Sequence, residues 1–243
     1  MMDAIRIENL TKCYGELTAV DNLSLSVRSG ELLALLGVNG AGKTTTIKML
    51  SCLAQPTCGD AFLEGKSIRR ESSAVKSIIA VSPQETAVAP GLTVRENLDM
   101  MCGVHGIPKP QRRERLAQLC QMLELTSVME RKAGKLSGGW QRRLSIAMAL
   151  VSRPKILFLD EPTLGLDVIA RSDLWDIIRS LKGKITIILT THYMEEAEAL
   201  SDRIAIMRSG RLLCCGSAAE IKSQAGTDRF EDAFIRIVKG VQS

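Results

Sequence analysis

The chain opens with alternating apolar and polar residues and then changes to unbroken apolar runs. "AIRIEN" at residues 4–9 and "LSLSV" at 23–27 alternate, which predicts two strands that each bury one face. "ELLALL" at 31–36 is almost wholly apolar and predicts a strand buried on both faces. A glycine-rich loop then leads into "KTTTIKMLSCL" at 43–53, which has helical character. The first part of the chain therefore predicts strands, a loop and a helix in that order.

The middle of the chain changes from strands to helices. "AFLEG" at 61–65 and "SIIAVSPQ" at 77–84 predict two more strands, and the second ends in a polar loop. Between about residue 92 and residue 152 the pattern favours helices only, in "TVRENLDMMCGVHG", in "KPQRRERLAQLCQMLEL" and in the stretch after "LSGG". We interpret this block as a separate helical subdomain.

Strands and helices alternate again after residue 152. The strands are "KILFLDEP" and "KITIILTTH", the helices are "VIARSDLWDIIRSL" and "YMEEAEALS", and "RIAIMRSGRLLCCG" is a hairpin that turns at Ser209-Gly210. Near-continuous apolar strands separated by helices predict an α/β fold with a mostly parallel sheet covered on both faces. In the tail "RFEDAFIRIVKG", Phe230, Phe234 and Ile237 share one helical face, so we expect this helix to dock on the domain.

Composition narrows the function classes. The longest apolar runs, such as "LLALL", are far shorter than the roughly 18 residues that a membrane-spanning helix needs. "MMDAIRIENL" lacks the apolar stretch of a signal peptide, so we interpret the chain as cytoplasmic. The seven cysteines form no zinc-binding spacing and are interpreted as reduced thiols. The net charge is only +5 and the basic run "RRER" at 112–115 has no aromatic neighbours, which indicates a solvated helix face and no nucleic-acid partner.

One segment carries a phosphate-binding motif. "GVNGAGKT" at 37–44 matches G-x-x-x-x-G-K-[ST] and lies between a predicted buried strand and a predicted helix, as this motif requires. Gly40 and Gly42 allow backbone N–H groups to close around phosphates, Lys43 supplies positive charge, and the Thr44 hydroxyl can ligate Mg²⁺. The loop predicts nucleotide binding.

Polar residues follow three other predicted strands. Asp160 and Glu161 end "ILFLDEP", where Asp160 can hold Mg²⁺ through water and Glu161 can polarise an attacking water. A solvated Asp-Glu turn would be the preferred interpretation if the phosphate-binding loop were absent. His192 ends "ITIILTTH" and is interpreted as a γ-phosphate sensor, with a satisfied structural histidine as the alternative. Gln84 ends "IIAVSPQ" and could bridge metal and attacking water.

Together these motifs resemble the ATP-binding cassette (ABC) transporter family. The resemblance spans "CYG" with Tyr14, the phosphate-binding loop, Gln84, the signature-like "LSGGW" at 136–140, the Asp160-Glu161 pair, "LGLD" ending in Asp167, and His192. It implies a P-loop NTPase fold of the ABC ATPase type, with a mostly parallel sheet core, an antiparallel β subdomain and an inserted helical subdomain. It further implies one ABC ATPase domain over residues 1–243, with the helical subdomain at about 92–152 and a C-terminal helical tail at about 226–243.

The resemblance also implies a head-to-tail dimer. In this family each ATP lies between the phosphate-binding loop of one subunit and the signature of the other. The implied catalytic residues are Glu161, His192, Gln84 and Lys43, and the implied Mg²⁺ ligands are Thr44, Gln84 and Asp160. The implied ATP-binding residues are Tyr14, Val20, Gly37, Val38, Asn39, Gly40, Ala41, Gly42, Lys43, Thr44, Thr45, Ser137, Gly138, Gly139 and Asp167. Tyr14 would stack on adenine, with a plain surface aromatic as the alternative.

Two positions depart from the family pattern. Val38 stands where the family usually has proline, and its side chain is not a phosphate ligand. Trp140 stands where the signature usually ends in glutamine, and an indole can donate one hydrogen bond but cannot accept one as an amide does. We hypothesise that Trp140 packs against the helical subdomain or a partner subunit, with ordinary core packing as the alternative.

Within the family, "LTVRENL", "TTHYMEEAEALSDRIAIM" and "FEDAFIRI" look most like the ATPase subunits of bacterial multidrug and antibiotic-resistance exporters. This likeness implies ATP hydrolysis that powers export, with ATP and Mg²⁺ as cofactors. The implied partners are integral membrane permease subunits and a second copy of the chain or a related ATPase subunit. The implied location is peripheral, on the cytoplasmic face of the inner or plasma membrane. The alternative is a soluble ABC ATPase that transports nothing, such as an iron–sulfur assembly ATPase.

Overall fold

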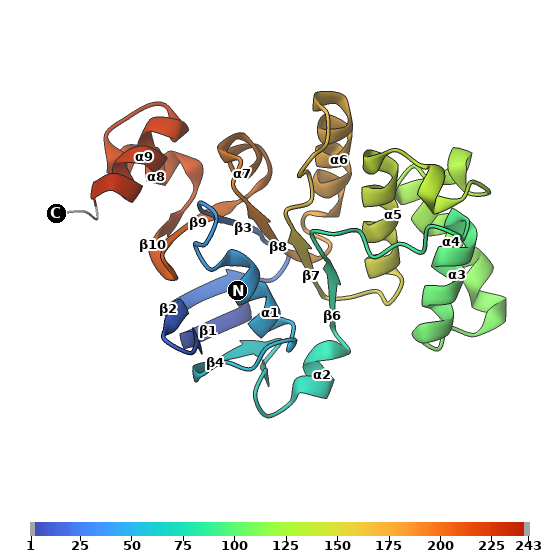
Figure 1. Ribbon diagram of the computed structural model, residues 1–243, viewed down its shortest axis with the longest axis horizontal. Helices are drawn as coiled ribbons and strands as arrows, with labels where there is room; N and C mark the ends of the chain where they lie inside the picture. The colour runs from blue at the N-terminus through green and yellow to red at the C-terminus, as the bar shows by residue number, and fades with distance from the viewer. Residues whose placement is uncertain (1–2, 241–243) are drawn as a thin grey trace.

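The computed structural model describes residues 3–240 and contains two β-sheets (Figure 1). The smaller sheet is antiparallel, with the order β2 (Leu17–Arg28), β1 (Asp3–Tyr14), β4 (Cys58–Leu63) and β5 (Lys66–Ser67). Register shifts interrupt the pairing of β1 with β2 at several points, as β-bulges do. The alternation in "AIRIEN" and "LSLSV" belongs to strands that extend several residues beyond these runs.

The larger sheet has six strands in the order β10 (Arg211–Gly216), β9 (Arg203–Arg208), β3 (Leu32–Leu36), β8 (Thr186–Thr191), β7 (Ile156–Asp160) and β6 (Ile79–Ser82). The five strands from β9 to β6 are parallel, and β10 joins β9 as an antiparallel hairpin. Every residue of β3, β7 and β8 is buried, because both faces of this sheet are covered. The expected α/β class with a mostly parallel sheet is confirmed.

Helices cover the larger sheet and extend beyond it at both ends (Figure 1). The helices are α1 (Lys43–Leu50), α2 (Ser72–Lys76), α3 (Val94–Val104), α4 (Lys109–Met122), α5 (Gly138–Leu150), α6 (Val168–Leu181), α7 (Met194–Leu200), α8 (Ala218–Ala225) and α9 (Phe230–Gly240), with single 3₁₀ turns at Thr126–Val128 and Ala133–Lys135. In Figure 1, α3, α4 and α5 lie at the right, whereas α8 and α9 lie at the opposite end. In the part of the chain from 3 to 240, no helix has the length and apolar character needed to cross a membrane.

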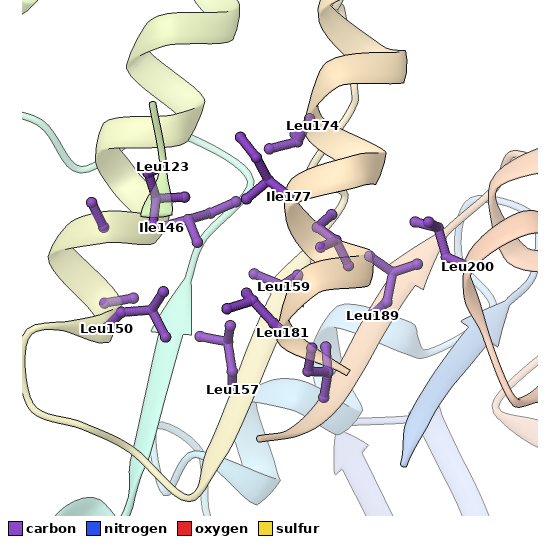
Figure 2. Packing of buried hydrophobic residues seen from close by; sticks show 14 of the residues in the cluster. Leu123, Ile146, Leu150, Leu157, Leu159, Leu174, Ile177, Leu181, Leu189 and Leu200 are labelled. Carbon is purple, nitrogen blue, oxygen red and sulfur yellow. The ribbon is translucent and has the colours of Figure 1, made fainter. Parts of the chain in front are cut away.

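Two hydrophobic clusters form the core, one on each face of the larger sheet. On one face, side chains of α5 and α6 pack over leucines of β7 and β8, as Figure 2 shows. The residues labelled there are Leu123, Ile146, Leu150, Leu157, Leu159, Leu174, Ile177, Leu181, Leu189 and Leu200. On the other face, Phe158 and Ile188 join a second cluster that includes residues of β1, β2 and α1. Neighbouring residues of β7 and β8 thus enter opposite clusters, which explains why these strands are apolar without alternation.

The C-terminal helix α9 docks as expected. Phe230 is buried, and Phe234 and Ile237 are partly buried against the larger core cluster. The last three positions of the expected tail at about 226–243 lie outside the described residues, as do the first two positions of the expected domain. The helix α8 was not predicted, although Ser217 and Glu220 form a capping box at its start.

The basic run on α4 is not simply a solvated face. The Arg112 guanidinium donates to the Ile107 carbonyl at 2.8 Å and lies 3.2 Å from Asp99. Arg115 donates to the carbonyls of Leu150 and Val151 at the end of α5. The prediction of a solvated face was therefore wrong for these two arginines, because their long side chains reach backbone carbonyls of neighbouring segments.

Candidate functional site

A pocket of about 780 Å³ opens where parallel strands of the larger sheet end. β3, β6, β7 and β8 are parallel, so their carboxyl ends meet at one edge of the sheet. The residues that line the pocket are Tyr14, Leu17, Thr18, Ala19, Asn39, Gly40, Ala41, Gly42, Lys43, Thr44, Thr45, Gln84, Glu161, Leu164, His192 and Ser209. The pocket therefore gathers residues from segments that lie far apart in the chain.

The glycine-rich loop between β3 and α1 forms one wall of this pocket. Gly42 is the N-cap of α1 and has a φ of +99°, and a Cβ there would lie 2.6 Å from the Ala19 carbonyl oxygen. Glycine alone fits both the backbone conformation and the close approach. The N–H groups of the first turn of α1 have no partners within the helix, so they can donate to an anion in the pocket.

Lys43 is held at the base of the loop. Its ammonium donates to the Gly37 carbonyl at 2.7 Å and lies 3.4 Å from the Glu161 carboxylate. Both side chains are nearly inaccessible to water, at 6% and 8% exposure. A buried positive charge with such well-defined partners is a fixed electrostatic feature of the pocket.

Asp160 ends β7 beside two hydroxyl groups. Its Oδ1 accepts from Thr44 Oγ1 at 3.2 Å and from Thr190 Oγ1 at 2.5 Å. A carboxylate beside a threonine hydroxyl supplies the hard oxygen donors that Mg²⁺ prefers. The residues present therefore fit a magnesium site at this point.

Glu161 is held by its backbone and by both carboxylate oxygens. Its φ of +49° is uncommon for a residue other than glycine, and its N–H donates to Thr190 Oγ1 at 3.0 Å. Oε1 faces Lys43 at 3.4 Å, and Oε2 lies 2.5 Å from His192 Nδ1. The carboxylate is therefore oriented between a cation and an imidazole at the edge of the pocket.

Gln84 follows β6 and lines the same pocket. It is exposed, and its backbone carbonyl accepts a hydrogen bond from Arg142 of α5 at 2.5 Å. The same guanidinium donates to the Pro83 carbonyl at 2.6 Å. The backbone of the Gln84 segment is thus attached to α5.

The Ser-Gly-Gly turn lies outside this pocket, at the start of α5. Ser137 is the N-cap of this 13-residue helix, its hydroxyl makes no capping bond, and it is exposed together with Gly138. A Cβ at Gly139 would lie 3.0 Å from the Ala170 Cβ, so the turn packs closely on the start of α6. Asp167 caps α6 by accepting from the Ala170 N–H at 2.9 Å. The turn and Asp167 therefore form a second group of candidate residues.

Comparison with known proteins supports one assignment. The family model described as "ABC transporter" matches residues 20–164, which include the phosphate-binding loop, the Ser-Gly-Gly turn and the Asp160-Glu161 pair. The chain belongs to the ABC transporter family. It is accordingly an ATP-binding and ATP-hydrolysing domain of that family.

Individual relatives agree with this membership. The chain is 44% identical to the "ATP-binding cassette sub-family A member 2" of Rattus norvegicus, a match that covers 98% of this chain and 10% of the relative. It is 40% identical to the "Doxorubicin resistance ATP-binding protein DrrA" of Mycobacterium tuberculosis, a match that covers 97% of this chain and 70% of the relative. The chain thus spans a tenth of the first relative and over two thirds of the second. Neither name refers to iron–sulfur assembly.

A solved structure shares the fold. It is described as the dimeric structure of a post-hydrolysis state of an ATP-binding cassette bound to ADP and Pi, with a TM-score of 0.78 and 27% identity. The match covers 88% of this chain and 98% of that chain. This likeness confirms the expected ABC ATPase fold.

Three residues expected to bind ATP have other surroundings in this ABC domain. Val20 is fully buried, and a Cβ at Gly42 would lie 3.3 Å from its Cγ2, so Val20 packs behind the loop rather than in the pocket. Gly37 is also buried, and it holds Lys43 through its carbonyl. Val38 is half exposed, and its carbonyl lies 3.4 Å from the Lys43 ammonium. Direct contact between Val20 and ATP stays a prediction, and the burial of this side chain behind the loop does not favour it.

Trp140 packs within its own chain. It is partly buried against the larger core cluster, and the Arg143 guanidinium lies 4.9 Å from the centre of its ring. Arg143 also pairs with Glu124 at 2.5 Å and with Asp173 at 2.9 Å. These contacts show Trp140 packed against the helical subdomain and the core cluster of its own chain, and its contact with a partner subunit stays a prediction.

Sequence reasoning missed several residues that support the site. Thr190 binds both Asp160 and the Glu161 N–H, and its only sequence signal was its place two residues before His192. Glu196 is fully buried and accepts from Thr163 Oγ1 at 2.8 Å and from Trp175 Nε1 at 3.2 Å. Burial raises the pKa of the Glu196 carboxyl, and hydrogen bonds from neighbouring side chains partly oppose this shift.

Proposed function

We propose that this ABC domain pairs head to tail with a second copy or a related ATPase subunit and drives export through integral membrane permease subunits. The observation that carries this proposal is the division of the candidate residues into two groups. One group lines a pocket with the phosphate-binding loop, whereas Ser137, Gly138, Gly139 and Asp167 lie outside it. A second subunit is needed to bring the outer group to a nucleotide in the pocket.

Within the pocket, Glu161 acts as the general base. Water attacks the γ-phosphorus and gives its proton to the Glu161 carboxylate, while the bond from phosphorus to the ADP oxygen breaks. His192, at 2.5 Å, orients this carboxylate, and Lys43 offers its charge to the phosphate oxygens. Both partners leave Glu161 one defined orientation, as a general base requires.

A magnesium ion would be held by Thr44, Asp160 and Gln84. When bound, it neutralises negative charge on the phosphate oxygens. The 3.2 Å contact between Thr44 Oγ1 and Asp160 Oδ1 supports the first two ligands. Gln84 lines the same pocket, and its exposed side chain is available to the ion.

The remaining ATP contacts also come in two groups, one at the pocket and one at the exposed start of α5. Tyr14 is 49% exposed at the pocket rim and offers a ring face to adenine, with the Lys12 ammonium 4.9 Å from its ring centre. The exposed start of α5 directs unpaired N–H groups and the positive end of a helix dipole toward the γ-phosphate of the partner's ATP. The dimeric state named for the solved relative bound to ADP and Pi supports this arrangement.

The helical part at about 92–152 would act as the subdomain that passes motion to the permease. It contains both the Ser-Gly-Gly turn and Arg142, whose guanidinium donates a hydrogen bond to the Gln84 carbonyl. ATP binding can therefore move it as a unit. The tail at about 226–243 is proposed as a structural appendage of the single ATPase domain. The name of the mycobacterial relative, a doxorubicin resistance ATP-binding protein, supports export and a location on the cytoplasmic face of the membrane.

Light scattering on a sizing column tests the pairing. Glu161→Gln protein should bind ATP, lose about 10²- to 10⁴-fold in turnover, and double its mass only when ATP and Mg²⁺ are present. Glu114→Gln, on the exposed face of α4, is the matched control and should keep wild-type turnover. An ATP-bound Glu161→Gln protein that stays monomeric would contradict the proposed pairing.

A further inference from the structure

Arg142 is a buried arginine whose charge is directed at the Gln84 segment. It lies on α5 and is 4% exposed, and its two terminal nitrogens donate to the Pro83 carbonyl at 2.6 Å and the Gln84 carbonyl at 2.5 Å. Hydrogen bonds from a charged donor are stronger than those between neutral groups, and the planar guanidinium fixes the direction of the two bonds to the carbonyls. Among the residues from 3 to 240, none of the salt bridges includes Arg142, so these two carbonyls are its defined partners.

A second contact reinforces this attachment. Ser145 lies three residues after Arg142 on the same side of α5, and its Oγ is 3.0 Å from Ser82 Oγ in a buried position. The segment from Ser82 to Gln84 is therefore joined to α5 at both ends. Because α5 also packs on β6, it cannot slide along this segment without breaking these bonds.

The Gln84 segment and the start of α5 face different parts of the surface. Gln84 lines the pocket of its own subunit, whereas the Ser-Gly-Gly turn at the start of α5 lies outside that pocket. Arg142 lies four residues after Gly138, about 6 Å along the helix axis. A displacement of the Gln84 backbone is thus transmitted over roughly one helical turn to the exposed N-terminus of α5.

We propose that Arg142 is a positioning residue that couples the two ATP sites of the dimer. Through it, ATP in a subunit's own pocket fixes the orientation of the turn that this subunit offers to its partner's ATP. This inference rests on the head-to-tail pairing proposed above. Since coupling between two binding sites is reciprocal, the partner's ATP also fixes the Gln84 segment.

The test compares cooperativity with binding. Arg142→Gln removes the charge and the two-pronged contact, Arg142→Lys keeps the charge with a single ammonium, and Arg113→Gln on the exposed face of α4 is the matched arginine control. The measurements are the Hill coefficient and kcat of ATP hydrolysis, and the Kd of a fluorescent ATP analogue for dilute, monomeric protein. Circular dichroism and thermal unfolding check that each variant is folded.

We expect the wild-type chain and Arg113→Gln to hydrolyse ATP with a Hill coefficient above 1. Arg142→Gln should bring this coefficient to about 1 and lower kcat by about 10-fold, which corresponds to a rise of about 1.4 kcal/mol in activation free energy. The Kd of the monomer should change by less than about 3-fold, since Arg142 does not line the pocket. Arg142→Lys should restore part of the cooperativity.

Each contrary result has a distinct meaning. If Arg142→Gln keeps both cooperativity and kcat, the coupling role is overturned while the proposed function stands. If the monomer Kd weakens as much as kcat falls, Arg142 shapes only its own pocket and the coupling role is again overturned. If wild-type protein binds ATP but Glu161→Gln never pairs, both the head-to-tail proposal and this inference are overturned together.

Discussion

Thr190→Val should weaken the site without leaving a void, because the two side chains have nearly the same shape. The Thr190 hydroxyl donates to Asp160 Oδ1 at 2.5 Å and accepts from the Glu161 N–H at 3.0 Å. The Glu161 N–H keeps a second acceptor, the Thr190 carbonyl at 3.2 Å, and Asp160 keeps the Thr44 hydroxyl. The loss is therefore dominated by one charged hydrogen bond, and we expect the free energy of unfolding to fall by about 2–3 kcal/mol.

The assay is urea unfolding followed by circular dichroism, with ATP turnover measured in parallel. Thr186→Val on the same strand is the matched control, because the Thr186 hydroxyl accepts from the neutral Gly30 N–H at 3.0 Å. It should cost about 1 kcal/mol, with turnover unchanged. Thr190→Val should also lower kcat, since Asp160 and Glu161 lose their shared support. Equal unfolding midpoints and equal turnover for the two variants would refute the reasoning.

Three further outcomes follow from burial and charge. Trp140→Ala removes the ring beside Arg143 and should lower the free energy of unfolding by about 2 kcal/mol in urea titration, whereas an unchanged midpoint contradicts the packing. Val20→Ala leaves a gap behind Gly42 and should raise KM for ATP together with a loss of stability; a raised KM at unchanged stability would instead mean direct ATP contact. Burial raises the pKa of Glu196 above its ordinary value of 4.5, so the folded state favours the neutral form and wild-type stability is lost as pH rises above that value. In urea titrations at a series of pH values, Glu196→Gln should therefore gain stability relative to wild type as pH rises above 4.5, and a constant difference would contradict the shift.

The motifs that could be predicted are short and continuous. The phosphate-binding loop, the Asp160-Glu161 pair and the Ser-Gly-Gly turn each carry their chemistry within a few residues, so their residue types and spacing suffice to recognise them. The apolar runs of β3, β7 and β8 likewise indicate a parallel sheet, because a strand covered on both faces needs apolar side chains at every position.

The parts that could not be predicted depend on contacts between distant segments. Arg142 donates to the Gln84 carbonyl, 58 residues away in the sequence, and an arginine after the Ser-Gly-Gly turn gives no sign of its partner. Arg115 looks in the sequence like one charge in a solvated run, yet it reaches the end of α5. Family likeness implies that Val20 contacts ATP, and the sequence gives no sign that its side chain is completely buried and does not line the pocket.

The sequence by itself determined the chemistry of the pocket, since phosphate binding and water activation need particular groups at fixed local spacing. Only the tertiary structure decided how these groups are held and which of them share a surface. It placed the Ser-Gly-Gly turn and Asp167 outside the pocket that holds the phosphate-binding loop. The physical reason is that hydrogen bonds such as those of Thr190 and Arg142 form only after the sheet and α5 have packed, and no local pattern specifies that packing.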